Sequence, residues 1–380
     1  CIRDRHIRLA HKVAQSSIVL LKNKNSILPL NKKIKKVAVV GPNADNRYNM
    51  LGDYTAPQED ENIKTVLDGV ISKLSPSKVE YVRGCAIRDT TVNEIAEVVE
   101  AASRSEVIIA VVGGSSARDF KTSYQETGAA IADEKSISDM ECGEGFDRAT
   151  LTLLGKQQDL LNALKATGKP LIVVYIEGRP LDKVWASEYA DALLIASYPG
   201  QEGGYAIADV LFGDYNPAGR LPVSVPRSVG QIPVYYNKKA PCNHDYVEQA
   251  ASPLYTFGYG LSYTTFEYSD LQVMRKSPCY FEVSFKVKNT GSYDGEEVAQ
   301  LYLRDEYASV VQPLRQLKCF ERFFLKRGEE KEIFFTLTEK DLSIIDRNMK
   351  RVVETGDFRI MIGASSDDIR LTKDISVESL

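Results

Sequence analysis

The sequence contains no long apolar run and few side chains of the kinds that bind metals. No stretch reaches the roughly 18 consecutive apolar residues that a membrane-spanning helix needs, and the six cysteines are scattered without a C-x-x-C pair. The three histidines, His6, His11 and His244, also lack the spacing of metal ligands. A zinc cluster and a dense disulfide framework are therefore not indicated, and we expect neither a metal nor a cofactor.

Charge of one sign is not in excess either. The chain has 48 lysines and arginines against 52 aspartates and glutamates, a formal net charge of −4, and no basic block is interleaved with aromatic residues. Proteins that bind nucleic acids or membrane surfaces carry such basic patches. We therefore expect no nucleic-acid partner and no membrane partner.

The glycine strings of nucleotide-binding folds are incomplete. Val40–Gly41–Pro42 and Gly113–Gly114–Ser115 each follow a strand-like run, but neither continues into a full G-x-G-x-x-G pattern. A phosphate loop that ends in Lys and Ser or Thr is also absent. Dinucleotide binding is kept only as a remote alternative.

The patterns that are present suit two domains. A chain of 380 residues is too long for one ordinary core, since single cores usually stop growing at about 250 residues. In the first part, buried strand-like runs alternate with helix-like segments, which is typical of an α/β domain with a mostly parallel sheet sandwiched by helices. The strand-like runs are Val37–Val40, Val107–Val112, Leu171–Ile176 and Ala192–Ala196, and the helix-like segments are Ile63–Leu74, Val92–Ser103 and Lys156–Ala166. We place this domain at residues 1–230.

The second part has the pattern of an all-β domain. Residues 231–262 are rich in Pro, Asn, Tyr and Gly, which indicates an ordered connector. From Phe281 to Val287 apolar residues alternate with polar ones, as in a strand with one buried face. Further strand-like runs follow at Val298–Leu303, Glu332–Leu337 and Phe358–Ile362. This predicts a β-sandwich over residues 263–380.

Chemistry is expected in the long insertion Ala117–Arg148. Parallel sheets bind ligands at the carboxyl ends of their strands, and this insertion follows the strand-like run that ends near Gly113. Its length of about thirty residues without clear periodicity exceeds ordinary loop lengths, and such segments are often functional. We therefore expect catalytic residues in this segment.

Within the insertion, residues 141–148 read Glu-Cys-Gly-Glu-Gly-Phe-Asp-Arg. Glu144 stands between two glycines, which leave its backbone free to extend, and Asp147 and Arg148 are expected to form a bidentate ion pair that fixes the loop. Glycoside cleavage needs one carboxylic acid at the leaving oxygen and a second carboxylate, about 5 to 5.5 Å away in retaining enzymes. Glu144 can be one of the two. A solvated acidic loop is the alternative interpretation.

Motifs along nearly the whole chain resemble those of family-three glycoside hydrolases, the group of exo-acting β-glucosidases, β-xylosidases and β-N-acetylglucosaminidases. Each motif alone is weak, but their order is specific. They are Ala10–Asn23, Leu28–Pro29–Leu30, Val39–Asp45, Leu51–Tyr54, Tyr198–Gly204, Gly213–Pro222 and Phe257–Phe266. In addition, Gly143–Glu144–Gly145–Phe146–Asp147–Arg148 is similar to the acid/base motif of the family, Gly-Glu-Gly-aromatic-Asp-Arg.

This resemblance implies a fold, a reaction and a set of residues. In that family an N-terminal TIM barrel supplies an aspartate nucleophile, an α/β sandwich domain supplies a glutamate acid/base, and a fibronectin type III-like domain often follows. By resemblance, Glu144 is the acid/base of a retaining exo-β-glycosidase, and Asp147 and Arg148 support its loop. The implied substrate is an oligosaccharide or β-glycoside that ends in β-linked glucose or xylose, and the implied location is periplasmic or secreted.

Other residues near the strand ends carry weaker expectations. Arg118 and Asp119 follow the Gly113–Ser116 turn and are possible substrate-binding residues, although an ion pair that braces the loop is an equal alternative. Trp185 lies in a helix-like stretch and is interpreted as a core residue rather than a platform for a sugar ring. Asn43 and Asp53 are interpreted as caps or turn formers.

The barrel of the family has no counterpart in the pattern of these 380 residues. The sequence starts at Cys1 and runs at once into helix-like sequence, which we interpret as one piece of a longer or cleaved polypeptide, with a degenerate homologue as the alternative. We therefore expect the chain alone to be inactive and a TIM-barrel domain, in cis or in trans, to be its partner. The alternative function is a noncatalytic carbohydrate-binding or scaffolding module.

Overall fold

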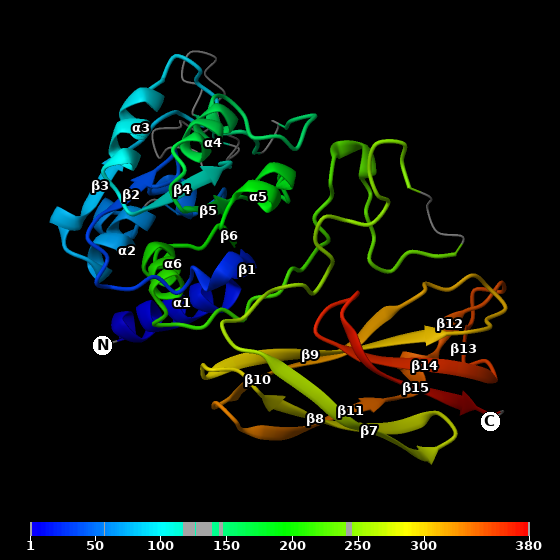
Figure 1. Cartoon of the computed structure of the whole chain (residues 1–380). Coiled ribbons are helices and arrows are strands. Elements are labelled where there is room, and N and C mark those ends of the chain that lie inside the picture. The colour runs from blue at the N-terminus through cyan, green and yellow to red at the C-terminus, as the bar shows by residue number, and fades with distance from the viewer. Residues whose placement is uncertain are drawn as a thin grey trace. The chain divides into compact units, whose positions relative to one another are not determined.

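The chain folds into two compact units, Cys1–Gly219 and Arg220–Leu380. The computed structural model describes residues 2–56, 58–116, 126, 139–143, 147–240 and 245–378. Helices and strands alternate in the first unit, and strands dominate the second (Figure 1). The domain limits expected from the sequence, at residues 230 and 262, stay predictions.

The first unit is built on a six-stranded sheet in the order β1-β6-β5-β4-β2-β3. Five strands pair in parallel, and β1 pairs antiparallel with β6 at one edge. β2, β4 and β5 are buried along their whole length, which explains their Val and Ile content, since strands covered on both faces read as continuous apolar runs. The strands are β1 (Val19–Asn23), β2 (Val37–Val40), β3 (Val79–Val82), β4 (Val107–Gly113), β5 (Leu171–Ile176) and β6 (Ala192–Ser197).

Helices cover both faces of this sheet (Figure 1). α1 and α2 pack against α6, and α3 packs against α4. The helices are α1 (Ile2–Ser17), α2 (Val66–Lys73), α3 (Ile95–Ser103), α4 (Gln157–Ala166), α5 (Val184–Tyr189) and α6 (Gly203–Phe212). The expected α/β fold, a mostly parallel sheet between helices, is confirmed.

Two glycines allow α2 and α6 to approach each other closely. A Cβ atom on Gly69 in α2 would lie 2.0 Å from the carbonyl oxygen of Gly204, and one on Gly204 would lie 1.8 Å from the carbonyl oxygen of Thr65. Thr65 also begins α2 through a capping box, in which its hydroxyl accepts the Asp68 N–H and its own N–H donates to the Asp68 carboxylate. The start of α2 and the first turn of α6 are therefore one packed corner.

The second unit is a sandwich of antiparallel sheets, as expected. One sheet has the order β10-β9-β14-β15, the other β11-β8-β7, and β12 and β13 form a short separate pair. The apolar core includes Val283, Phe285, Leu301 and Ile360, each with an exposed fraction of 0%. The elements are β7 (Phe266–Ser277), β8 (Tyr280–Asn289), β9 (Gly295–Asp305), β10 (Gln316–Leu325), β11 (Glu330–Leu337), α7 (Glu339–Leu342), β12 (Ile344–Ile345), β13 (Arg351–Val352), β14 (Gly356–Gly363) and β15 (Ile369–Val377).

The segment before β7 belongs to the second unit and is held on the sandwich by hydrogen bonds. The Gln300 side chain on β9 donates to the carbonyl of Gly258 at 3.2 Å, and the N–H of Ser366 donates to the carbonyl of Phe257 at 3.0 Å. A single bridge joins Lys239 to Pro313. Among the described residues, no helix of either unit is both long and apolar enough to cross a membrane.

Candidate active site

The residue predicted as the acid/base, Glu144, lies outside the described residues, as do Arg118 and Asp119. The structure does describe the chain on both sides of Glu144. We call residues 139–143 the first flank and residues 147–152 the second flank. The geometry of the candidate site is that of these two flanks and of the strand ends beside them.

Glycines at the carboxyl end of β4 make room for the first flank. A Cβ atom on Gly113 would lie 2.1 Å from the carbonyl oxygen of Ile176, so only glycine lets the ends of β4 and β5 meet there. A Cβ atom on Gly114 would lie 1.8 Å from Oε1 of Glu141. The N–H of Glu141 donates to the carbonyl of Ser115 at 2.8 Å. The first flank is thus seated directly on the end of β4.

A buried ion pair joins the two flanks. The Glu141 side chain is 0% exposed and that of Arg148 is 5% exposed, and Nη1 of Arg148 contacts Oε2 of Glu141. Arg148 also donates to the Thr150 hydroxyl at 3.2 Å and to the Thr152 carbonyl. Burial raises the pKa of Glu141, and the charge of Arg148 opposes that rise. Because the two residues stand on opposite sides of Glu144 in the sequence, their pair closes the base of the loop that carries it.

Asp147 forms a different ion pair from the one expected. Its Oδ1 lies 2.8 Å from Nη2 of Arg179, which follows β5, and also accepts the Arg148 N–H at 2.8 Å. The pKa of Asp147 is held below its ordinary value mainly by the hydrogen bond from the Arg148 N–H and also by Arg179. The expected pair between Asp147 and Arg148 is therefore wrong. Arg148 turns inward because the buried carboxylate of Glu141 needs a counter-charge more than the exposed Asp147 does.

Within the first flank, the side chain of Asp139 makes the contacts that fix its start. Its carboxylate accepts the N–H groups of Ile87 and Arg88, both at 2.7 Å, and that of Asp89 at 3.3 Å. The Arg88 guanidinium donates to the carbonyl of Met140 at 3.1 Å. These bonds tie the first flank to the turn that follows β3.

A chain of hydrogen bonds through two buried asparagine side chains also fixes the residues at the end of β4. Asn43, which is 0% exposed, donates to the carbonyl of Gly114 at 3.1 Å and accepts the Asn49 amide at 2.6 Å. Asn49 in turn accepts the Ser115 hydroxyl at 2.6 Å. Asn43 therefore has a structural role. Asp53 accepts the N–H of Tyr54 at 2.9 Å, as a turn former does.

A second buried ion pair follows β5, and the sequence alone did not reveal it. Nζ of Lys183 lies 2.7 Å from Oε1 of Glu177, with exposed fractions of 0% and 3%. The same ammonium lies 4.5 Å from the ring centre of Tyr175. Burial raises the pKa of Glu177 and lowers that of Lys183. In the sequence only the turn Gly178–Arg179–Pro180 between the two residues stands out, and a turn does not show whether Glu177 and Lys183 are buried.

Trp185 is neither fully buried nor isolated. It lies on α5, is partly exposed, and its ring centre is 5.2 Å from that of Tyr189. Its aromatic neighbour accounts for its position without a sugar ligand. In the part of the chain that the structure describes, no group of three or more His, Cys, Asp or Glu side chains is arranged to hold a metal ion.

Comparison with known families matches both units. The Glycosyl hydrolase family 3 C-terminal domain matches residues 18–263, and the Fibronectin type III-like domain matches residues 297–366. The first match covers more than half of the chain and includes both flanks.

Curated relatives align over nearly all of the chain. A β-xylosidase of Formosa agariphila is 40% identical over 384 residues, which cover 97% of this chain and 50% of the relative. A periplasmic β-glucosidase of Salmonella typhimurium is 39% identical over 402 residues, which cover 96% of this chain and 49% of the relative. The chain thus spans about half the length of the curated relatives it matches.

Solved structures of similar sequence share the fold. A β-glucosidase from Erythrobacter marinus superposes with a TM-score of 0.85 at 35% identity, over 98% of this chain and 50% of that one. A mutant β-glucosidase from Listeria innocua in complex with laminaribiose superposes with a TM-score of 0.84 at 32% identity, over 97% of this chain and 49% of that one.

Proposed function

Because the chain belongs to glycoside hydrolase family 3, we propose that it is the C-terminal region of a retaining exo-β-glycosidase that releases terminal β-linked glucose or xylose. The observation that carries the proposal is the alignment of nearly the whole chain with a β-xylosidase and a β-glucosidase. Both sugars stay in the proposal, since both kinds of relative align equally well.

In the proposed mechanism, Glu144 is the acid/base. It protonates the leaving oxygen in the first step and activates water in the second, while a carboxylate about 5 to 5.5 Å away attacks the anomeric carbon. That nucleophile belongs to a TIM-barrel domain, supplied in cis or in trans, and not to the described residues. Raising the pKa of Glu144 for this task requires desolvation and the charge of the nucleophile. We therefore expect Glu144 to titrate as an ordinary glutamate without the barrel.

The flanks support a positioning role for the residues around Glu144. An acid on a loop protonates efficiently only if the loop holds it near the leaving oxygen. Here the Glu141–Arg148 pair joins the two flanks, and the Asp147–Arg179 pair holds the second flank to the turn that follows β5. We propose that Asp147 and Arg148 support the acid/base loop through these separate pairs. Arg118 and Asp119 are kept as proposed contacts to the leaving-group sugar.

The test is hydrolysis by the chain joined to its natural upstream sequence. We expect activity on aryl β-xylosides or β-glucosides from the joined protein only. Glu144→Gln should lower kcat by about 10²- to 10⁴-fold on substrates with poor leaving groups and by less on activated aryl glycosides, since general acid catalysis contributes a factor of that size. The matched control is Glu126→Gln, an exposed carboxylate of the same insertion, which should keep full activity.

Azide gives the second readout. It attacks a glycosyl-enzyme without needing a general base, so it should restore turnover of an activated substrate by Glu144→Ala and yield a glycosyl azide with retained configuration. Binding of xylo-oligosaccharide without turnover in either protein would instead favour the noncatalytic module.

We also propose a periplasmic or secreted location, on the ground that one relative is named periplasmic. Fractionation of the native cells tests it.

A further inference from the structure

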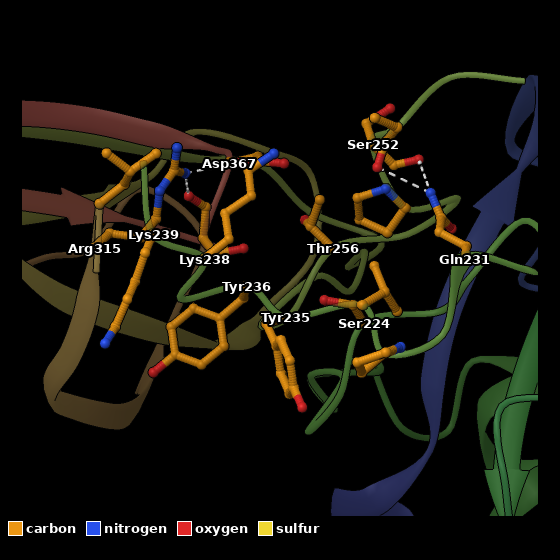
Figure 2. A pocket seen from close by; sticks show the side chains of 16 residues that line it. Ser224, Gln231, Tyr235, Tyr236, Lys238, Lys239, Ser252, Thr256, Arg315 and Asp367 are labelled. Atoms are coloured by element: carbon orange, nitrogen blue, oxygen red, sulfur yellow. Dashed lines mark hydrogen bonds and ion pairs between the residues drawn. The ribbon is translucent and has the colours of Figure 1, made fainter. Parts of the chain in front are cut away.

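A pocket in the second unit has no part in the proposed chemistry. It has a volume of about 450 Å³, within the range of about 300–1,000 Å³ that is usual for small-molecule sites. Its walls come from the segment before β7 and from loops of the sandwich (Figure 2). We call it the Tyr235 pocket. The lining includes Ser224, Gln231, Tyr235, Tyr236, Lys238, Lys239, Ser252, Thr256, Arg315 and Asp367.

The two ends of the Tyr235 pocket differ in charge. Figure 2 shows Lys238, Lys239 and Arg315 gathered at one end, and Ser224, Gln231 and Ser252 at the other. Asp367 neutralises one of the three cations, because its Oδ1 lies 2.7 Å from Nη1 of Arg315. Among the described residues, no carboxylate lies within ion-pair distance of Lys238 or Lys239. The first end is therefore positively charged, and the second is neutral and polar.

An aromatic wall lies between these ends. Tyr235 is 65% exposed, and Figure 2 shows its ring and that of Tyr236 in the part of the pocket between the two ends. Tyr236 is fixed from behind, since its ring stacks on Phe257 with centres 4.2 Å apart and its hydroxyl accepts the Leu317 N–H at 3.3 Å. The exposed ring face of Tyr235 offers an apolar surface to the C–H groups of a flat ligand.

The walls are held in place without a ligand. The buried Gln231 side chain accepts the Arg227 N–H at 2.8 Å and donates to the carbonyls of Ala251 and Ser252 at 2.9 and 3.1 Å. At the other end, the Leu314 N–H donates to the carbonyl of Lys238 at 2.9 Å. Walls that are already ordered reduce the entropic cost of binding a ligand.

We propose that the Tyr235 pocket binds a saccharide that carries a carboxylate, such as a glucuronic acid group on a xylo-oligosaccharide. Lys238 and Lys239 form charge-assisted hydrogen bonds with the carboxylate, Tyr235 stacks on the pyranose ring, and the hydroxyls of Ser224, Ser252 and Thr256 accept and donate bonds to the sugar hydroxyls. That the ligand carries an anionic group follows from the charges of the pocket. The choice of a sugar acid over another organic acid rests on the proposed function.

Calorimetric titration of the 380-residue chain tests this proposal. The probes are xylotriose with one glucuronic acid substituent, unsubstituted xylotriose, and citrate as a carboxylate without a sugar. We expect the acidic trisaccharide to bind at least about tenfold more tightly than either of the others. Raising NaCl from about 0.05 M to about 0.5 M should reduce that advantage, because the exposed ammonium groups are screened.

Variants assign the binding to the pocket. The double variant Lys238→Gln/Lys239→Gln should abolish the preference for the acidic probe, and Tyr235→Ala should weaken binding of both trisaccharides. Lys373→Gln and Tyr307→Ala change exposed residues of the same unit outside the pocket, and they should bind as the unaltered chain does. All these side chains are exposed, so thermal unfolding should confirm that each variant folds.

Three results would overturn the proposal: less than about a twofold preference for the acidic trisaccharide, a preference that Lys238→Gln/Lys239→Gln leaves unchanged, or citrate binding as tight as that of the sugar acid. None of these depends on catalysis. Loss of hydrolysis in the upstream-joined protein, by contrast, would contradict the proposed function and leave the anion-binding result in place.

Discussion

Two side-chain pairs, Glu141–Arg148 and Glu177–Lys183, place four charges in the interior of the first unit. Each charge has its counter-charge in contact, and the packing around the pairs leaves almost no exposed surface. Replacing a whole buried pair is often nearly neutral, whereas removing one partner leaves an uncompensated charge and costs about 3–5 kcal/mol. Single substitutions in these pairs should therefore be far more harmful than their conservative appearance suggests.

Arg148→Met is the first prediction. It leaves the Glu141 carboxylate buried without its cation, so the free energy of unfolding of the first unit should fall by about 3–5 kcal/mol, as measured by urea unfolding. Glu141→Gln/Arg148→Met should recover part of this loss. The control is Arg104→Met, which breaks a half-exposed pair with Glu80 and should cost much less than Arg148→Met, because solvent screens such pairs. Equal losses for Arg148→Met and Arg104→Met would contradict the buried-pair account.

Glu80 carries a prediction on pH. Its carboxylate pairs with Arg104 and, at 2.8 Å, with Lys36, and these bonds hold its pKa below the ordinary 4.5. The stabilisation is therefore complete above pH 4.5 and is lost as the pH falls through the lowered pKa of the folded state. Glu80→Gln should cost about 1 kcal/mol at pH 7, and the difference from the unaltered chain should shrink towards pH 3. A difference that stays constant over this range in urea unfolding would rule out the assignment.

Where α2 and α6 pack together, close packing and helix propensity predict opposite effects of a substitution. Alanine favours helices over glycine by about 1 kcal/mol, so preference alone predicts that Gly204→Ala stabilises α6. The Cβ would lie 1.8 Å from the Thr65 carbonyl oxygen, and overpacking of this kind costs about 1–3 kcal/mol or more. We expect net destabilisation by about 2 kcal/mol and a lower melting temperature.

Gly230→Ala is the matched control for that prediction. Gly230 has no left-handed φ and no atom nearer than 3.8 Å to its Cβ position, so this substitution should leave the melting temperature nearly unchanged. If Gly204→Ala raised the melting temperature, the close approach of the two backbones would be refuted.

The strands show which elements a sequence predicts and which it does not. β2 and β5 match the expected ranges because both are buried on two faces and read as unbroken Val and Ile runs. β1 was not set apart from the helix before it, and β3, which is only partly buried, was missed. Their identity as edge strands depends on the neighbour that each pairs with, β6 and β2. β3 is only partly buried and so carries a weak apolar pattern, whereas β1 is apolar but follows α1 with only Ile18 between them.

The candidate site also has one part that the sequence predicts and another that it does not. The local string around Glu144 could be found because its glycines and charges are adjacent in the sequence. The partners of Arg148 and Asp147 could not, because Glu141 is buried only where Gly114 leaves space for it, and Arg179 arrives from the end of β5. The Tyr235 pocket joins residues 224 and 367, and no local pattern predicts such a contact.

For the chain as a whole, the limits of the second unit can be tested by truncation. Residues 220–380 expressed alone should unfold cooperatively, since they contain a complete apolar core. Residues 263–380 should be less stable by several kcal/mol. They lose the buried pair of Arg220 with Glu297, whose atoms lie 2.6 Å apart, and the hydrogen bonds that Gly258 and Phe257 accept from the sandwich. Thermal unfolding of the two fragments checks this.

Equal melting temperatures for the two fragments would favour the limit at residue 262 that the sequence pattern suggested. The comparison also has a built-in control, because the double substitution Arg220→Met/Glu297→Gln in the longer fragment removes both charges together and should cost less than truncation does.

The ion pair between Glu141 and Arg148 has a practical consequence for protein engineering. Together with the pair of Asp147 and Arg179, it holds the two flanks in place by contacts of residues 141, 147 and 148. We therefore expect residues 142–146 to be exchangeable as a cassette. Libraries that vary these five positions while keeping Gly114, Glu141, Asp147 and Arg148 should yield a high proportion of folded proteins, and libraries that vary Gly114, Glu141 and Arg148 should not.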